Sequence, residues 1–242
     1  STYKIQNDMK KFTFVFIFSL LSSITFAQNA FFTKADAFLK KNVSNGNVKY
    51  ASIKANPSEL NELVKMVENY ALAGQSSATK KAFYLNAYNI SVIKGIIDKY
   101  PVAGPMKIAG FFDKVKHTVA GKQITLNDLE NKIIRPTYQD ARIHFALVCA
   151  AKGCPKIVPF AFTPSQVDSQ LTKVTKKAMD DAYFIRLKGN KVQYSQIFDW
   201  YKQDFLNEAS SIVAYINKYR TTKIPEKAKT SVYTYDWALN KI

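Results

Sequence analysis

Residues 142–155 hold most of the side chains in the chain that could do nucleophilic or metal chemistry. This short stretch contains His144, Cys149 and Cys154, which are one of the two histidines and both cysteines. An imidazole beside a thiol can lower the thiol pKa and so stabilise the reactive thiolate. The apolar run 143–149 between the histidine and the loop predicts a buried strand.

The first arrangement that this spacing allows is a disulfide between Cys149 and Cys154. An even number of cysteines in a protein with an export signal is compatible with such a bond. In a regular strand, side chains alternate between faces, so His144 and Cys149 would lie on opposite faces. Cys154 follows in a loop that could fold back towards either of them.

The second arrangement is a cysteine nucleophile activated by His144. Glu130, Asn86 or Asn89 would then orient the imidazole, as in papain-like and transglutaminase-like hydrolases. A disulfide removes the thiolate that this chemistry needs, so the first two arrangements exclude each other unless the bond is reversible. His144, Glu130, Asn86 and the two cysteines are therefore the candidate catalytic residues, and both alternatives stay open at this point.

The third arrangement is a zinc site made from His117, His144 and the two cysteines. The C-x4-C spacing is long for a metal-binding pair, and only one such pair is present. We therefore predict no metal and no other cofactor. His117, in a predicted hairpin, is more typical of a surface residue than of a ligand.

Two amides and one arginine accompany the cluster as candidate binding or orienting groups. Asn86 and Asn89 are three residues apart on a helix that is otherwise apolar, where buried amides must be hydrogen-bonded. They either tie loops to the core, which is the interpretation that we favour, or orient a reacting group. Arg142 should point away from His144 and pair with Glu130, Asp128 or Asp140. Asn89 and Arg142 are the predicted binding residues.

The net charge of +17 and its distribution indicate which anionic partners the protein could bind. Only four of the 35 basic residues are arginines, and the lysines are scattered through every segment. Nucleic-acid recognition favours clustered arginines with interleaved aromatic residues, so we expect no nucleic-acid partner. The charge leaves open a contact with the cell envelope or an anionic glycan. Serine hydrolase and glycosidase motifs are absent from the sequence.

The start of the chain predicts export. Met9-Lys10-Lys11 is followed by an apolar run over 12–26 and by Ala27, which together are typical of a signal peptide over 9–27 cleaved after Ala27. Residues 1–8 would be an expression remnant or a misassigned start. The apolar run is shorter than the roughly 20 residues of a spanning helix, and no second one follows. We expect a periplasmic or secreted protein without a transmembrane segment in its mature part.

Periodicity and turn signals predict an α+β fold: a mainly helical single domain over 48–242 around a small mixed or antiparallel sheet, with a papain- or transglutaminase-like arrangement as one alternative. A helical N-terminal extension over 28–47 precedes this domain. Helices are predicted over 31–43, 57–72, 76–100, 125–134, 164–182, 195–206 and 207–219. Strands are predicted over 48–50, 115–119, 123–125, 143–149, 183–187, 191–194 and 231–235.

Four ordered motifs resemble those of the domain of unknown function 547 family. They are Ala82-Phe-Tyr-Leu-Asn-Ala-Tyr-Asn89, the stretch 124–135, the stretch 142–155 and Ile197-Phe-Asp-Trp-Tyr-Lys-Gln-Asp-Phe205. The resemblance covers about 48–240, and the closing Tyr235-Asp-Trp-Ala-Leu-Asn240 is similar to the end of exported bacterial members. The resemblance implies that the family's motif residues correspond by position to Asn86, Asn89, Glu130, Arg142, His144, Cys149, Cys154 and Asp204.

One position departs from the family pattern. Many members carry histidine after the glutamate, whereas this chain has Asn131, which puts a shared catalytic role for Glu130 in doubt. The sequence therefore supports two hypotheses. One is an exported enzyme of thiol-dependent acyl transfer or amide hydrolysis. The other is a non-enzymatic, envelope-associated binding module with a structural Cys149–Cys154 disulfide.

Overall fold

The computed structural model describes residues 29–242. The predicted signal peptide over 9–27 and the preceding residues 1–8 lie outside the described residues. Within the described part, no helix is both long and apolar enough to cross a membrane.

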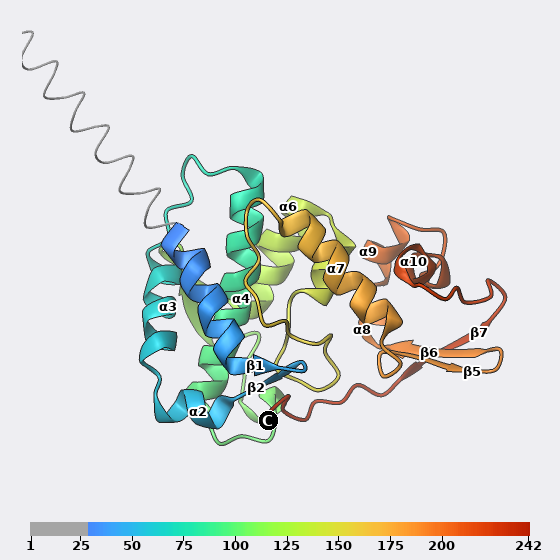
Figure 1. Ribbon diagram of the computed structural model, residues 1–242, viewed down its shortest axis with the longest axis horizontal. Helices are drawn as coiled ribbons and strands as arrows, with labels where there is room; N and C mark the ends of the chain where they lie inside the picture. Colours follow the sequence, from blue (N-terminus) through green and yellow to red (C-terminus); the bar gives the residue numbers. More distant parts are fainter. Residues whose placement is uncertain (1–28) are drawn as a thin grey trace, which may run out of the picture.

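Helices make up most of the described chain, and a helix over 29–42 (blue in Figure 1) comes first. The α-helices that follow are α2 (Tyr50–Ala55), α3 (Ser58–Glu68), α4 (Ser77–Lys99), α5 (Leu126–Asp128), α6 (Arg135–Tyr138), α7 (Val167–Asp180), α8 (Ile197–Trp200), α9 (Lys202–Leu206) and α10 (Ile212–Tyr219). Two 3₁₀-helices, Pro105–Lys107 and Ala141–Phe145, and a π-helix, Leu129–Ile134, complete the set.

The strands form three small sheets. Two are antiparallel hairpins, β1 (Val43–Ser44) with β2 (Asn47–Val48) and β3 (Lys116–Val119) with β4 (Lys122–Thr125). The third sheet has the order β5 (Ile185–Lys188), β6 (Lys191–Ser195), β7 (Lys229–Tyr233), in which β5 pairs antiparallel and β7 parallel with β6. The predicted α+β class and the mixed sheet are confirmed.

Helix α4 is the centre of the core, as its apolar circumference predicts. The Ser76 hydroxyl caps it by accepting a hydrogen bond from the Thr79 amide. The Phe83 ring on α4 packs against Tyr70, with 4.0 Å between centroids, and against Phe31 of the first helix, with 5.5 Å. The helix over 29–42 thus belongs to the same hydrophobic core as the rest of the domain.

The predicted strand over 143–149 is wrong. Its first part is the 3₁₀-helix Ala141–Phe145, and no strand pairs with the remainder. The reason lies on α4: the Asn89 amide donates to the Ala146 carbonyl and accepts from the Val148 amide, both at 2.9 Å. A side chain therefore satisfies the buried backbone that a neighbouring strand would otherwise satisfy.

The predicted helix end at Arg135–Pro136 is also wrong. The chain continues from α5 through the π-helix into α6, which ends at Tyr138. Proline inside an α-helix lacks an N–H and clashes with the carbonyl four residues back. Here the Arg135 amide donates to Glu130 O, five residues back, and this wider turn accommodates the proline.

Two smaller boundaries differ from the prediction. The strand expected over 48–50 stops at Val48, and Tyr50 opens the short helix α2. The last strand, expected over 231–235, is β7 and ends at Tyr233. The following residues 235–240, here called the C-terminal segment, run back towards the start of the domain (Figure 1).

The C-terminal segment joins parts of the chain that are far apart in sequence. Leu239 donates to Ala103 O at 2.8 Å, and the Val48 amide donates to Asn240 O at 2.9 Å. Lys152 and Gly153 donate to Ala238 O and Asp236 O, both at 2.8 Å. The segment thus fixes the loop that lies between the two cysteines.

We predict that Gly104→Ala loosens this segment. A Cβ at Gly104 would lie 2.1 Å from the Trp237 carbonyl oxygen, so one backbone must move away. Overpacking of this kind costs about 1–3 kcal/mol. Hydrogen exchange of the Lys152 and Gly153 amides should accelerate in the variant.

Gly74→Ala is the control for this experiment. Gly74 has a φ of +72°, but no heavy atom lies within 4 Å of the position that a Cβ would take, so alanine adds backbone strain there without a clash. It should lower stability without accelerating exchange at Lys152 and Gly153. Equal exchange in the two variants would contradict the role of the C-terminal segment.

Candidate functional site

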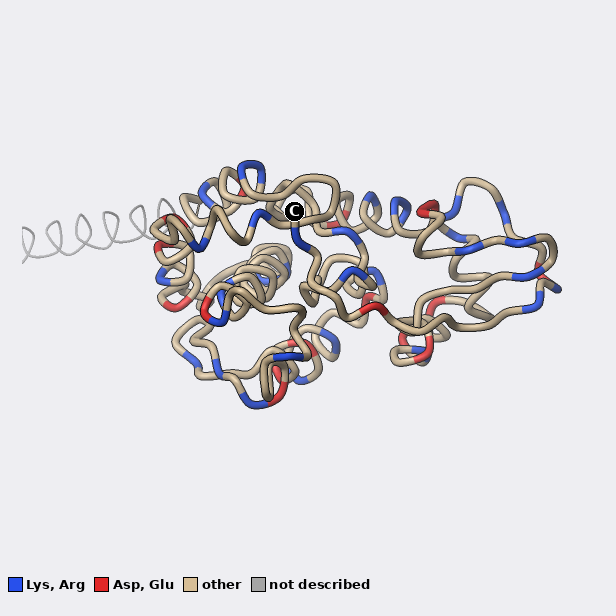
Figure 2. The backbone as a smooth tube through the Cα atoms, turned by 90° about the horizontal axis from the view of Figure 1, so that it is seen from below, with Lys and Arg blue, Asp and Glu red and all other residues tan. Residues whose placement is uncertain are grey.

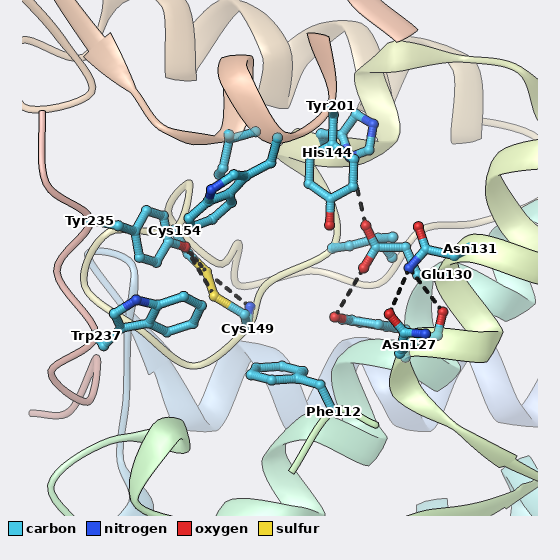
Figure 3. A pocket seen from close by; sticks show the side chains of 14 residues that line it. Phe112, Asn127, Glu130, Asn131, His144, Cys149, Cys154, Tyr201, Tyr235 and Trp237 are labelled. Carbon is cyan, nitrogen blue, oxygen red and sulfur yellow. Dashed lines mark hydrogen bonds and ion pairs between the residues drawn. A yellow bond between two sulfur atoms is a disulfide. The ribbon is translucent and has the colours of Figure 1, made fainter. Parts of the chain in front are cut away.

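The described residues enclose a cavity of about 270 Å³ at the place where the sequence predicts that the sulfurs and the polar groups meet (Figure 3). Its lining combines three kinds of side chain: two sulfurs, a polar group around an imidazole, and aromatic rings. The lining residues are Tyr88, Phe112, Asn127, Glu130, Asn131, His144, Leu147, Cys149, Cys154, Ile197, Trp200, Tyr201, Tyr235 and Trp237.

His144 is held in a fixed orientation. The residue is only 3% exposed, and its ring stacks on Tyr201 with 3.9 Å between centroids. The Nε2 atom lies 2.8 Å from Oδ2 of Asp204, and Nδ1 lies 3.8 Å from Oε1 of Glu130. The ring thus lies between two carboxylates, one within hydrogen-bonding distance of Nε2 and one near Nδ1.

Asp204 is itself fixed by Arg135. The guanidinium donates two hydrogen bonds, Nε to Oδ2 at 2.8 Å and Nη2 to Oδ1 at 2.9 Å. The hydrogen bond from His144, followed by those from Arg135, holds the pKa of Asp204 well below its ordinary value. Arg135 Nη1 also donates to Asn131 Oδ1 at 2.5 Å, so the residue that departs from the family pattern supports this ion pair.

Glu130 reaches the cavity because it lies on the π-helix. π-helical turns are uncommon and often occur at functional sites. The Tyr88 hydroxyl donates to Glu130 Oε2 at 3.4 Å. Burial and the nearby Glu130 carboxylate raise the pKa of both Tyr88 and Tyr201. Both phenols therefore stay protonated as donors beside this carboxylate.

Cys149 and Cys154 form a disulfide, which confirms the first of the three predicted arrangements. The Tyr235 hydroxyl lies 2.9 Å from the Cys154 sulfur and 3.0 Å from the Cys149 sulfur. Between the cysteines, buried Ala150 adopts a φ of 63°, a conformation that non-glycine residues rarely adopt. The C-terminal segment holds the loop in this shape.

The sulfurs and the imidazole border the same cavity but do not touch. Figure 3 shows the disulfide beside Tyr235 and Trp237, and His144 on the other side, beside Tyr201 and Glu130. The hydrogen bond of the His144 ring within residues 29–242 goes to Asp204.

The two amides lie outside this cavity lining. The Asn86 amide donates to Phe162 O at 2.7 Å and accepts from the Phe162 amide at 3.0 Å, and Asn89 holds the backbone at Ala146 and Val148. Both side chains thus tie loops to α4, which is the interpretation favoured from the sequence.

Arg142 and His117 lie elsewhere as well. Arg142 donates to both oxygens of Asp140 at 2.9 Å and to Asp168, so the predicted pairing with Asp140 is confirmed. His117 lies on β3 and lines a different depression. The four side chains of the zinc hypothesis therefore do not meet, and no group of three or more metal-ligating side chains occurs among residues 29–242.

Sequence reasoning missed the aromatic wall of the cavity. Trp200, Tyr235 and Trp237 pack on one another with centroids 4.6–5.9 Å apart, and Phe112 lies 6.2 Å from Trp237. The sequence identifies Asp204 only by resemblance, without a role. The sequence did contain a signal for each. Trp200 and Asp204 lie in the motif 197–205, and Trp237 lies in the closing motif 235–240.

The fold and the site define an α+β protein with a disulfide-lined aromatic cavity and a buried histidine paired with a partly exposed aspartate. Residues 72–177 match the family described as "Protein of unknown function, DUF547", which supports the predicted resemblance to this family. This region includes Glu130, His144 and both cysteines. Neither the curated proteins nor the solved structures contain a significant match to the chain. The papain- or transglutaminase-like arrangement therefore stays a prediction.

We predict that Asn86→Ala destabilises the fold by about 2–3 kcal/mol, because it leaves the buried amide and carbonyl of Phe162 without partners. Urea unfolding measures this loss. The exposed Asn61→Ala on α3 is the control and should change stability by less than about 0.5 kcal/mol. Equal stability of the two variants would show that Asn86 does not tie the loop to α4.

We predict that Asp204→Asn makes the free energy of unfolding less sensitive to acidic pH. The folded-state pKa of Asp204 is lowered, so its ion pairs stabilise the fold above the unfolded pKa of about 3.9 and are lost as pH falls further. The variant should be about 2 kcal/mol less stable at neutral pH. The difference should shrink as the pH falls below about 3.9, as measured by urea unfolding at a series of pH values. A pH-independent difference would rule out the charge of Asp204 as its cause.

Proposed function

We propose that the protein is an exported binding protein whose cavity takes up a neutral or cationic organic ligand. The observation that carries the proposal is the composition of the cavity lining. It contains aromatic rings, amides, one imidazole and the Glu130 carboxylate, and no lysine or arginine occurs among the described residues that line it. This is unusual in a chain with 35 basic residues.

The charge of the lining decides between classes of ligand. Without a lysine or arginine on the cavity wall, an anionic ligand would lose hydration next to the Glu130 carboxylate and would find no such cation to pair with. A cationic group could instead lie between Glu130 and the faces of Trp200, Tyr235 and Trp237, where cation–π attraction contributes. A sugar ring could use the same rings for stacking and the Asn127 side-chain amide for hydrogen bonds.

In this proposal the disulfide supports the cavity wall. Both sulfurs are bonded to each other, and both lie within hydrogen-bonding distance of the Tyr235 hydroxyl. The Tyr235 ring in turn packs on Trp237 at 4.6 Å. The bond therefore holds one side of the aromatic wall in place, and a binding module needs no thiolate.

The predicted export is consistent with this role. Disulfides persist in oxidising compartments such as the periplasm and the extracellular space. The signal-peptide pattern over 9–27 predicts such a compartment. Envelope association is part of the proposal, since an exported protein meets the envelope in either location.

Thiol-dependent acyl transfer or amide hydrolysis is the second candidate. The favouring observation is that His144, which is hydrogen-bonded to Asp204, and both cysteines line one cavity. A dithiol reductant would have to convert the disulfide to two thiols. One thiol would pass its proton to His144, and the thiolate would attack a substrate carbonyl to form a thioester while the leaving amine or alcohol takes that proton from His144. Water, or another acceptor in the acyl-transfer case, would then release the acyl group and return the thiol. This candidate requires hydrolysis of activated esters that appears only after reduction and disappears in His144→Ala.

Binding is tested by intrinsic fluorescence, because Trp200 and Trp237 are the only tryptophans of the chain and both line the cavity. The probes are choline, a neutral N-acetylated disaccharide and a carboxylate of similar size. We expect choline or the disaccharide to shift the emission and the carboxylate to leave it unchanged. Glu130→Gln should weaken choline binding about tenfold, corresponding to about 1.4 kcal/mol.

Glu226→Gln removes the same charge from an exposed position and is the control. It should bind each probe as the unchanged protein does. Binding of the carboxylate at least as tight as that of choline and the disaccharide would contradict the proposed function.

A further inference from the structure

Three lysines lie side by side across the sheet β5–β6–β7. Lys188 pairs directly with Lys191, and Lys191 pairs directly with Lys229. Directly paired side chains point to the same face, and neighbouring strands are about 4.8 Å apart. Arg186 lies on this face too, two residues from Lys188 along β5. The three lysines are here called the lysine row, with Arg186 beside it.

Within residues 29–242, no acidic side chain forms an ion pair with the lysine row. The ion pairs found among residues 29–242 involve other basic side chains, so no carboxylate lies within 4.0 Å of these three ammonium groups. Like charges at directly paired positions destabilise a sheet. A row that repels itself within the fold is therefore better explained by an external anionic partner than by stability.

Apolar side chains accompany the charge. Tyr183, just before β5, is 42% exposed, Leu187 on β5 is 46% exposed and Val232 on β7 is 41% exposed. They are three of the six exposed large hydrophobic residues in the described part of the chain. Leu187 and Val232 lie on the face opposite the lysine row, because side chains alternate along a strand. Of the three, only Leu187 lies at the same end of the sheet as the lysine row, because Val232 pairs with Tyr194 and Tyr183 precedes β5, both at the other end.

The position of the sheet makes this end accessible. Figures 1 and 2 show β5, β6 and β7 at one end of the long axis, with basic residues along the strands and away from helices α2, α3 and α4. Lys188 and Lys191 flank the turn at Gly189, and Lys229 begins β7 beside them, so all three stand at the tip of the sheet. Leu187 is adjacent to Lys188 at the same tip.

We propose that the tip of this sheet docks on an anionic lipid surface. Each lysine close to such a surface gains electrostatic attraction to the headgroups, and the adjacent Leu187 side chain can enter the interface. A soluble polyanion would satisfy the lysine row but would leave Leu187, which is 46% exposed beside it, in water. The inference goes beyond ligand binding in the cavity, because it concerns a separate surface and does not depend on the cavity's occupant.

The test is sedimentation with vesicles of mixed phosphatidylglycerol and phosphatidylcholine, compared with pure phosphatidylcholine vesicles. The full chain without its predicted signal peptide should bind only the mixed vesicles, and binding should weaken as salt rises. The triple variant Lys188→Gln, Lys191→Gln and Lys229→Gln should bind about 100-fold more weakly.

The matched control is the triple variant Lys65→Gln, Lys107→Gln and Lys122→Gln. It removes the same charge from exposed lysines outside the sheet. This control should bind the mixed vesicles within about threefold of the unchanged protein, because its lysine row is intact. Equal loss in both triple variants would show that net charge, and not the row, is responsible.

Leu187→Asn separates a lipid surface from a soluble polyanion. It should weaken vesicle binding several-fold while leaving binding to heparin unchanged. Heparin binding without any preference for the mixed vesicles, or vesicle binding that Leu187→Asn does not change, would overturn the proposal. The cavity fluorescence of each variant with choline should match that of the unchanged protein, so a failure here is distinguishable from a failure of the proposed function.

Discussion

The backbone hydrogen bonds of the C-terminal segment are the constraint on which the rest of the site depends. This short segment bonds to Val48 near the start of the domain, to Ala103 after α4, and to Lys152 and Gly153 between the cysteines. Gly153 has room for no side chain there, because a Cβ would lie 2.9 Å from the Asp236 amide. The same segment carries Tyr235 and Trp237 into the cavity. One stretch of chain therefore positions the disulfide loop and the aromatic wall at the same time.

The opposite side of the cavity depends on a chain of polar contacts. Asn131 supports Arg135, Arg135 holds both oxygens of Asp204, and Asp204 fixes His144. The π-helix supplies the spacing, since it brings Glu130 towards the imidazole while Arg135 starts α6. Each polar side chain in this series has a hydrogen-bond partner in the next one, which is the condition under which buried polar groups are tolerated. A position that departs from the family pattern, Asn131, is part of this chain.

Much of the helical framework could be predicted from local signals. The cap at Ser76, the apolar circumference of α4 and the turn at Gly189 are each contained in a few neighbouring residues, and the structure agrees with them. The grouping of His144 with the cysteines and Glu130 was also predicted, partly through the resemblance. What these features share is that short-range sequence determines them.

The features that were missed depend on contacts between distant residues. An apolar run such as 143–149 is equally compatible with a strand and with backbone that a buried amide satisfies, and only the position of Asn89 decides between them. The π-helix follows from the way Pro136 is accommodated, not from periodicity. Likewise, Trp200 is distant in sequence from Tyr235 and Trp237 and meets them only when the C-terminal segment folds back. No local pattern contains that information.

The Cys149–Cys154 disulfide beside the aromatic cavity is the feature on which the proposed binding role depends. The most direct measurement is the number of alkylated cysteines in protein purified without reductant, counted by intact mass in denaturant before and after reduction. We predict no label before reduction and two labels afterwards, since the chain has two cysteines and both are in the disulfide. Stoichiometric labelling of either cysteine before reduction would contradict the proposed binding role.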